Sequence, residues 1–132
     1  MFEELEHTAD LAIRVSAINL HDLFTEASMA VMALSGIELQ SGPIHENTIK
    51  LHAADPESLL VNWLEELIYE IEVNHRAYDD FHIVIDGDYS LQATVKLVPI
   101  ASISRLIKAV TFHEMAIQQV ADRLETVIVF DV

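Results

Sequence analysis

The sequence predicts a single α+β domain over residues 1–132, in which two helices pack on one extended, mostly antiparallel sheet of six to seven strands. Two observations predict this class. Two stretches in the first half carry apolar residues at helical spacing, whereas the second half alternates apolar and polar residues at the period of two that is typical of strands. No repeat, low-complexity stretch or linker divides the chain.

The first predicted elements are a strand and a helix. Residues 11–15 alternate between apolar and polar positions, as in a strand with one buried face. Asn19 is a suitable N-cap for the helix that follows, because its side chain accepts a hydrogen bond from the first turn. Gly36 stands where a glycine in the left-handed conformation ends many helices.

A second strand and a second helix come next. Residues 49–53 alternate again. Asp55 and Pro56 then form a strong start signal, namely a capping carboxylate followed by proline at the first helical position. The apolar stripe over residues 59–71 makes this helix the best-supported element of the chain.

The second half is predicted to consist of strands. Residues 81–85 run into Asp86-Gly87, a dipeptide that suits a two-residue hairpin turn. The returning strand covers residues 89–98, and Pro99 is expected to end it. Up to three further strands are predicted, at residues 106–113, 115–120 and 124–132.

Composition limits the class of protein. Apolar residues make up 52% of the chain and charged residues 22%, as in a globular protein. The absence of cysteine excludes disulfides, thiolate metal sites and a cysteine nucleophile. The N-terminus carries Glu3, Glu4 and Glu6 where a signal peptide needs positive charge, and no apolar run reaches the roughly 18 residues of a membrane span. We therefore expect a cytoplasmic protein that does not enter a membrane.

The charge is strongly negative. Asp and Glu number 22 against 7 Lys and Arg, which gives a formal net charge of −15. Because phosphate contacts dominate nucleic-acid affinity, and no basic cluster is present, RNA is expected to reach this protein only through a partner. An acidic surface suits cations or the basic face of another protein. The alternative is that the acidity only keeps the protein soluble.

Two aspartates are the main candidates for a site. Asp10 precedes the first predicted strand and Asp131 lies near the end of the last. If those strands are neighbours, the two carboxylates converge, and Val132 adds a backbone oxygen and the α-carboxylate. Oxygen ligands suit a hard cation, Ca²⁺, Mg²⁺ or Mn²⁺, rather than zinc. On the residues alone, a turn cap at Asp10 and a solvated Asp131 are the simpler interpretation.

Other catalytic templates are absent or weak. The chain has no G-x-S-x-G, P-loop or G-x-G-x-x-G motif. His7 and His113 each invite an acid–base interpretation, but a structural role is simpler because no nucleophile is predicted beside them. Lys108 lies in a predicted strand and either contacts a partner or pairs with a carboxylate; the excess of acids favours pairing.

Five stretches together resemble the archease family. The opening EHTADLAIRV is similar to the family signature E-H-T-A-D-[VIL]-[GA]. LLVNWLEELIY, IDGDYSLQATV, IKAVTFHEM and the terminal VIVFDV agree in the expected order and extend the resemblance over the whole chain. The chain departs from the family at Phe112 and Glu114, where tyrosine and aspartate are common.

The resemblance implies a function and reverses the simpler interpretation of the aspartates. Archeases resemble non-enzymatic helpers of the RtcB-type RNA ligase of tRNA splicing: they promote its guanylylation and multiple turnover and broaden its nucleotide use. The implied metal site, described with calcium, corresponds here to Asp10, Asp131 and Val132. His7, Lys108 and His113 are carried over as predicted contacts of the ligase.

Two other functions stay open at this point. A small metal-dependent phosphoester hydrolase would use Asp10, Asp131 and His7, and it would turn over substrate alone. A general chaperone or interaction module would depend on the acidic surface and not on the aspartate pair.

Overall fold

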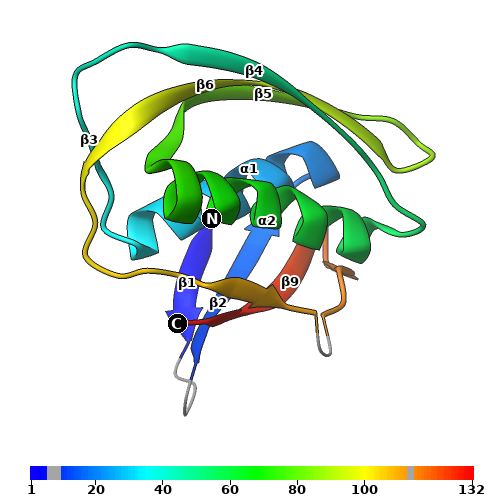
Figure 1. Ribbon diagram of the computed structural model, residues 1–132. Helices are drawn as coiled ribbons and strands as arrows, with labels where there is room; N and C mark the ends of the chain where they lie inside the picture. Colours follow the sequence, from blue (N-terminus) through cyan, green and yellow to red (C-terminus); the bar gives the residue numbers. More distant parts are fainter. Residues whose placement is uncertain (6–9, 113–114) are drawn as a thin grey trace.

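The computed structural model describes residues 1–5, 10–112 and 115–132 and confirms the α+β class (Figure 1). Two helices are present in this part of the chain, α1 (Leu20–Leu34) and α2 (Pro56–Asn74). The strands are β1 (Phe2–Leu5), β2 (Leu11–Ala17), β3 (Glu38–Leu39), β4 (His45–His52), β5 (Arg76–Ile85), β6 (Ser90–Ser102), β7 (Ala109–Thr111), β8 (Gln118–Val120) and β9 (Arg123–Asp131).

The strands form two antiparallel sheets, so the expectation of one extended sheet is wrong. Five strands form one sheet in the order β1-β2-β9-β7, with β8 also paired to β9. The other has the order β3-β6-β4, with β5 also paired to β6. Figure 1 shows the two helices between the sheets. Helix α1 contacts β2 and β5, and α2 contacts β7 as well as β4 and β5, so each helix packs against both sheets.

The helices begin at the predicted caps. The Asn19 side chain accepts a hydrogen bond from the Asp22 N–H at 2.8 Å. Asp55 accepts one from the Ser58 N–H at 2.7 Å, and Pro56 occupies the first helical turn. These contacts satisfy backbone donors that have no partner within the helix. No described helix is both long and apolar enough to span a membrane.

Gly36 ends α1 because no other residue fits there. Its φ is +63°, in the left-handed region that favours glycine, and an added Cβ would lie 2.6 Å from the Ser104 Oγ. The adjacent Ser35 carbonyl accepts a hydrogen bond from the Ser104 N–H at 2.9 Å. The helix end is therefore attached to the segment that follows β6.

Pro99 does not end its strand, which continues to Ser102. Strand β6 changes partner at this point: β4 pairs with it up to Leu97, and β3 pairs with it from Ile100. The missing N–H of Pro99 thus falls between the two partners, and its carbonyl accepts a hydrogen bond from the Gln40 N–H at 2.8 Å. Proline is tolerated where no ladder donor is needed.

The hairpin between β5 and β6 also differs from the expectation. Four residues separate the strands instead of two, and the residue with positive φ is Tyr89 (60°), not Gly87. The Tyr89 N–H donates to the Asp86 carbonyl at 3.0 Å, and the Asp86 N–H donates to the Ser90 carbonyl at 2.9 Å. The turn is therefore closed by Asp86 from both sides.

Trp63 of α2 is at the centre of the core and is fully buried. Its ring lies 5.5 Å from that of Tyr78 and 6.2 Å from that of Phe81, both on β5. The Trp63 Nε1–H donates to the Ser28 Oγ of α1 at 2.6 Å. Burial raises the pKa of Tyr78 above its ordinary value of 10.0, and nearby carboxylates raise it further, so this phenol stays neutral.

The Trp63–Ser28 hydrogen bond joins the two helices, and we expect Ser28→Ala to be destabilising. The substitution leaves the indole N–H buried without an acceptor, which costs about 2 kcal/mol of unfolding free energy. Urea denaturation of wild type, Ser28→Ala, Trp63→Phe and the double variant measures the effect. In this cycle the two losses should not add, because Trp63→Phe removes the donor. If the two losses of unfolding free energy add, the Trp63–Ser28 hydrogen bond does not stabilise the fold as predicted.

The Asp55 cap predicts a pH-dependent contribution to stability. The Ser58 N–H holds the pKa of Asp55 below its ordinary value of 3.8. Because the pKa of the Asp55 carboxylate is lowered in the folded state, its ionised form stabilises the fold at pH values above 3.8. This contribution is lost as the pH falls through the pKa of the folded state. Asp55→Asn keeps an acceptor oxygen but does not titrate. Urea denaturation should therefore give wild type a higher free energy of unfolding than Asp55→Asn at neutral pH, and this difference should disappear in acid. A difference that is the same at every pH would refute the prediction.

Candidate functional site

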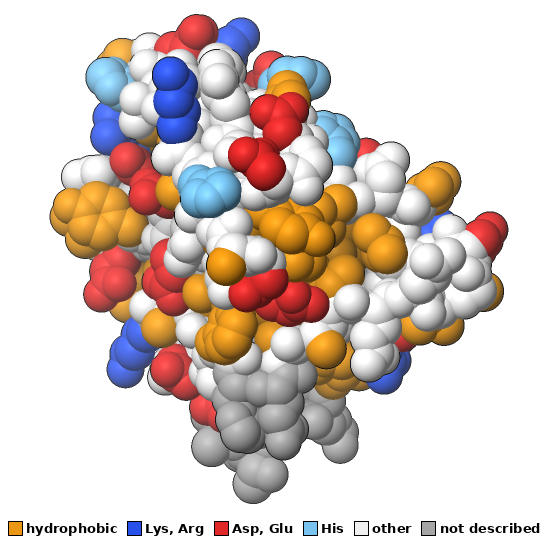
Figure 2. Space-filling model, turned by 90° about the vertical axis from the view of Figure 1, so that its right-hand side faces the viewer, with side chains coloured by type: hydrophobic (Ala, Val, Ile, Leu, Met, Phe, Trp, Pro, Cys, Tyr) orange, Lys and Arg blue, Asp and Glu red, His pale blue; other side chains and the backbone are white. Residues whose placement is uncertain are grey.

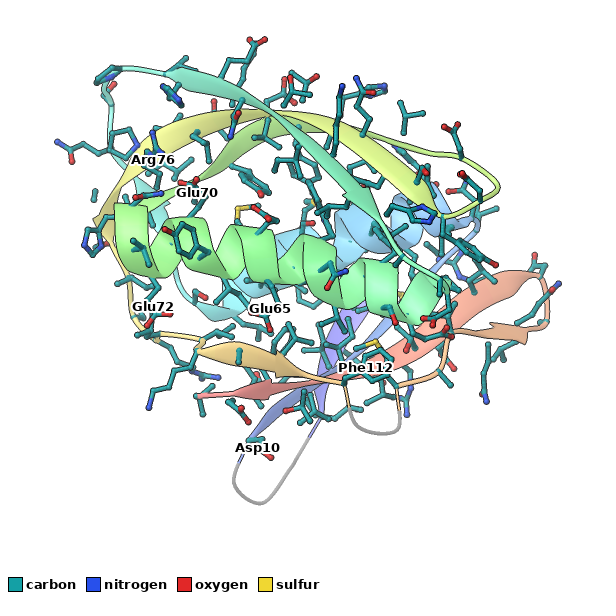
Figure 3. All side chains as sticks on the ribbon, turned by 45° about the vertical axis from the view of Figure 1, so that its right-hand side comes forward. Asp10, Glu65, Glu70, Glu72, Arg76 and Phe112 are labelled. Carbon is teal, nitrogen blue, oxygen red and sulfur yellow. The ribbon has the colours of Figure 1, made fainter. Side chains whose placement is uncertain are left out.

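Strands β2 and β9 are neighbours, as the convergence of the two aspartates requires. The strands pair antiparallel, and Leu11 lies opposite Phe130. Asp10 directly precedes Leu11 and Asp131 directly follows Phe130, so both aspartates adjoin this last pair of the ladder. Figure 3 shows Asp10 at the lower end of β2. Asp10 is half-buried and Asp131 is exposed. Two residues 121 positions apart in sequence thus lie at the same end of one sheet.

Strand β7 holds Asp131 from the other side. The Thr111 hydroxyl donates to the Asp131 Oδ1 at 3.3 Å, and the Lys108 N–H donates to the Asp131 carbonyl at 2.8 Å. Ala109 is the register partner of Asp131. The sequence did not single out Thr111, although it lies within the quoted IKAVTFHEM stretch. Its role depends on the pairing of β7 with β9, which no local pattern reveals.

The remaining predicted site residues have different outcomes. Lys108 is exposed, and its ammonium group forms no ion pair with a carboxylate of the described residues. Val132 is exposed and directly follows β9, beside Asp131. His7 and His113 lie outside the described residues.

The donor set at this end of the sheet fits a hard cation. Asp10, Asp131 and Val132 offer carboxylate and carbonyl oxygens, the ligands that Ca²⁺ and Mg²⁺ prefer. Ca²⁺ takes six to eight oxygen ligands, so water or partner groups are required in addition. Within the described part of the chain, no three His, Asp or Glu side chains are grouped for metal binding. A site here would therefore be open on one side.

Two arginines in or near the same sheet pair with glutamates. Arg14 on β2 forms an ion pair with Glu3 on β1, and its Nε lies 3.9 Å from the Glu125 carboxylate on β9. Arg105 lies 3.8 Å from the Glu4 carboxylate. These pairs are in large part exposed to solvent and contribute little stability. Asp131 forms no ion pair with these arginines.

Sequence comparison identifies relatives over the full length. The Archease protein family matches residues 2–132. The protein archease of Methanosarcina mazei is 31% identical over 140 residues, covering 99% of this chain and 95% of that protein. The protein archease of Methanosarcina acetivorans is 30% identical over 142 residues, with the same coverage.

Two solved structures have the same fold. The crystal structure of an archease from Thermotoga maritima, described as a possible chaperone, is 26% identical with a TM-score of 0.74 and covers 98% of this chain and 96% of that one. The solution structure of a Methanobacterium thermoautotrophicum protein is 24% identical with a TM-score of 0.72 and covers 99% and 98% of the two chains. The latter likeness supports the fold alone.

The predicted cation site has a thermodynamic consequence. Because binding to the folded state alone stabilises it, Ca²⁺ at about 100 times its dissociation constant should add about 2.7 kcal/mol to the unfolding free energy. Asp131→Asn should remove this gain, because a ligand charge is lost. Thermal unfolding followed by circular dichroism, with Ca²⁺ and with chelator, measures it.

The matched control is Asp122→Asn, which removes an exposed aspartate in the turn between β8 and β9. It should respond to Ca²⁺ as wild type does. An equal loss of the response in both variants would mean that the ion only screens the acidic surface.

Proposed function

Because the chain belongs to the archease family, we propose that it is a non-enzymatic activator of an RtcB-type RNA ligase. In this role it promotes guanylylation of the ligase, supports multiple turnover and broadens nucleotide use. The observation that supports the proposal most directly is the β2–β9 ladder, which brings Asp10 and Asp131 to one end of a sheet. The ligase supplies the nucleophile, so the activator needs only to bind and orient.

In this proposal the two aspartates act in the guanylylation step, in which the ligase reacts with GTP. A divalent cation held here would stabilise the negative charge on the pyrophosphate that leaves GTP when the ligase histidine attacks the α-phosphate. Asp10 and Asp131 hold that cation at the sheet end, Val132 adds oxygen donors, and Thr111 orients the Asp131 carboxylate through its 3.3 Å hydrogen bond. The exposure of Asp131 leaves room for the ligase to complete the coordination.

The surface charge supports docking on a basic face. A net charge of −15 attracts a positively charged partner and accelerates the encounter. The same charge repels RNA, so in this proposal the RNA is contacted by the ligase alone. Lys108 is carried over as a ligase contact; the residue is exposed, and its backbone N–H binds the Asp131 carbonyl.

A chaperone function is the second candidate, because the Thermotoga maritima relative is described as a possible chaperone. Figure 2 shows apolar side chains gathered on one face and bordered by acidic ones. A surface of this kind could bind unfolded clients without any contribution from the aspartates. A metal-dependent hydrolase, the third candidate, would turn over a phosphoester without a ligase.

The decisive measurement is guanylylation and multiple-turnover RNA ligation by the cognate ligase with GTP and Mn²⁺. We expect stimulation by wild type and by Asp122→Ala, and loss of most stimulation with Asp131→Ala, because only the last removes a proposed ligand. Circular dichroism confirms that each variant is folded. The proposal fails if wild type does not stimulate the ligase.

Two further assays distinguish the other candidates. Suppression of aggregation of unrelated clients that is insensitive to Asp131→Ala would favour the chaperone. Phosphoester hydrolysis by the purified protein alone would favour the hydrolase.

A further inference from the structure

Strand β7 is held from its outer edge by a side chain of helix α2. The strand has three residues and pairs with β9 on one edge only. On the other edge, the Val110 N–H donates to the Glu65 Oε1 at 3.0 Å. Figure 3 shows Glu65 on the side of α2 that faces β7. A carboxylate therefore takes the place that a neighbouring strand would fill.

The same helix repeats this contact two turns earlier. Glu57 Oε2 accepts a hydrogen bond from the Ile117 N–H at 2.8 Å. Eight residues separate Glu57 from Glu65, which corresponds to about 12 Å along one side of a helix. Residues 110 and 117 are thus both attached to α2, and β7 cannot move along or away from the helix without breaking a charge-assisted hydrogen bond.

The inner edge of β7 carries the contacts to Asp131. The Lys108 N–H and the Thr111 hydroxyl both bind Asp131, and Val110, which binds Glu65, lies between them in sequence. A three-residue strand makes few ladder bonds, so the buried Val110 side chain and the Glu65 hydrogen bond both help to hold it in place. The position of the Thr111 hydroxyl relative to the Asp131 carboxylate therefore depends on what holds Val110.

We propose that Glu65 is a positioning residue for the aspartate site: by accepting the Val110 N–H it fixes β7, and through β7 it orients Asp131. The inference rests on the proposed function, because it assigns Glu65 a part in cation binding and ligase activation. The hydrogen-bond reach of the side chain, not its charge, is what the site requires. Groups that orient metal ligands typically change metal affinity about 10- to 100-fold when removed.

Two substitutions distinguish the effect of the reach of the Glu65 side chain from the effect of its charge. Glu65→Gln keeps an acceptor oxygen at the same distance but removes the charge. Glu65→Asp keeps the charge but is shorter by one methylene and does not reach Val110. Glu66→Asp is the matched control, because Glu66 is the exposed neighbour on α2 and makes no hydrogen bond or ion pair with any described residue. All three variants are conservative changes in the middle of α2.

The test combines three readouts on the full chain. Isothermal titration measures Ca²⁺ affinity, amide hydrogen exchange measures the protection of Val110 and Lys108, and guanylylation of the ligase measures activation. We expect Glu65→Asp to weaken Ca²⁺ binding about tenfold, with a similar loss of activation and reduced protection of both amides. Glu65→Gln and Glu66→Asp should remain within about twofold of wild type.

The outcomes separate this inference from the proposed function. If wild type binds Ca²⁺ and activates the ligase but Glu65→Asp does so equally, the positioning role is wrong and the proposed function stands. If Glu65→Gln is weakened and Glu65→Asp is not, Glu65 acts by charge and the inference is overturned. If wild type neither binds Ca²⁺ nor activates, the proposed function fails and the positioning role fails with it.

Discussion

The antiparallel ladder between β2 and β9 is the constraint on which the rest of the structure depends. It joins the first and last long strands of the chain over seven register pairs, with Ile13 opposite Ile128 and both fully buried. Contacts between residues more than a hundred positions apart carry a high loop-closure cost, so they form late unless other elements bring the ends together. The helices do this, because α1 packs on β2 and contacts β9. The same ladder brings Asp10 and Asp131 to one end of the sheet, beside the Leu11–Phe130 pair, so the core and the candidate site depend on one set of hydrogen bonds.

Helix α2 contributes both to the stability of the core and to the geometry of the candidate site. Its apolar stripe, centred on Trp63, fills the space between the two sheets. Glu57 and Glu65 lie on the side of the helix that faces the end of the five-stranded sheet, where they accept backbone hydrogen bonds. An edge strand normally exposes donors that invite pairing with another chain. Glu65 accepts a hydrogen bond from the Val110 N–H. This bond restricts the movement of β7 and makes the Val110 donor unavailable for pairing with another chain.

Local signals in the sequence predicted both helices and most of the long strands, whereas the short strands β1 and β3 were not predicted. What the local signals did not predict depends on tertiary partners. Asn19 and Asp55 act as caps because a capping side chain bonds within four residues, which a single sequence records. The division into two sheets and the continuation of β6 through Pro99 depend on which strands pair with one another. No local sequence pattern contains that information. The site follows the same rule. The aspartates were candidates from their places at the ends of two predicted strands, and the family resemblance favoured them as metal ligands. Thr111 and Glu65 gain their roles only when β7 lies between β9 and α2.

Some of the acidic residues serve the fold directly, among them Asp55, Glu57 and Glu65. Carboxylates that cap a helix or accept a strand N–H are stabilised by backbone donors and need no cation. The described arginines are largely used in pairs such as Arg14–Glu3 and Arg76–Glu70, and such pairs neutralise only a small part of the net charge of −15. The remaining field destabilises the compact state through self-repulsion, and it attracts cations and basic surfaces. In the proposed function, a cation or a basic partner at Asp10 and Asp131 would relieve part of that repulsion at one end of the β2–β9 ladder, so binding would also stabilise the fold.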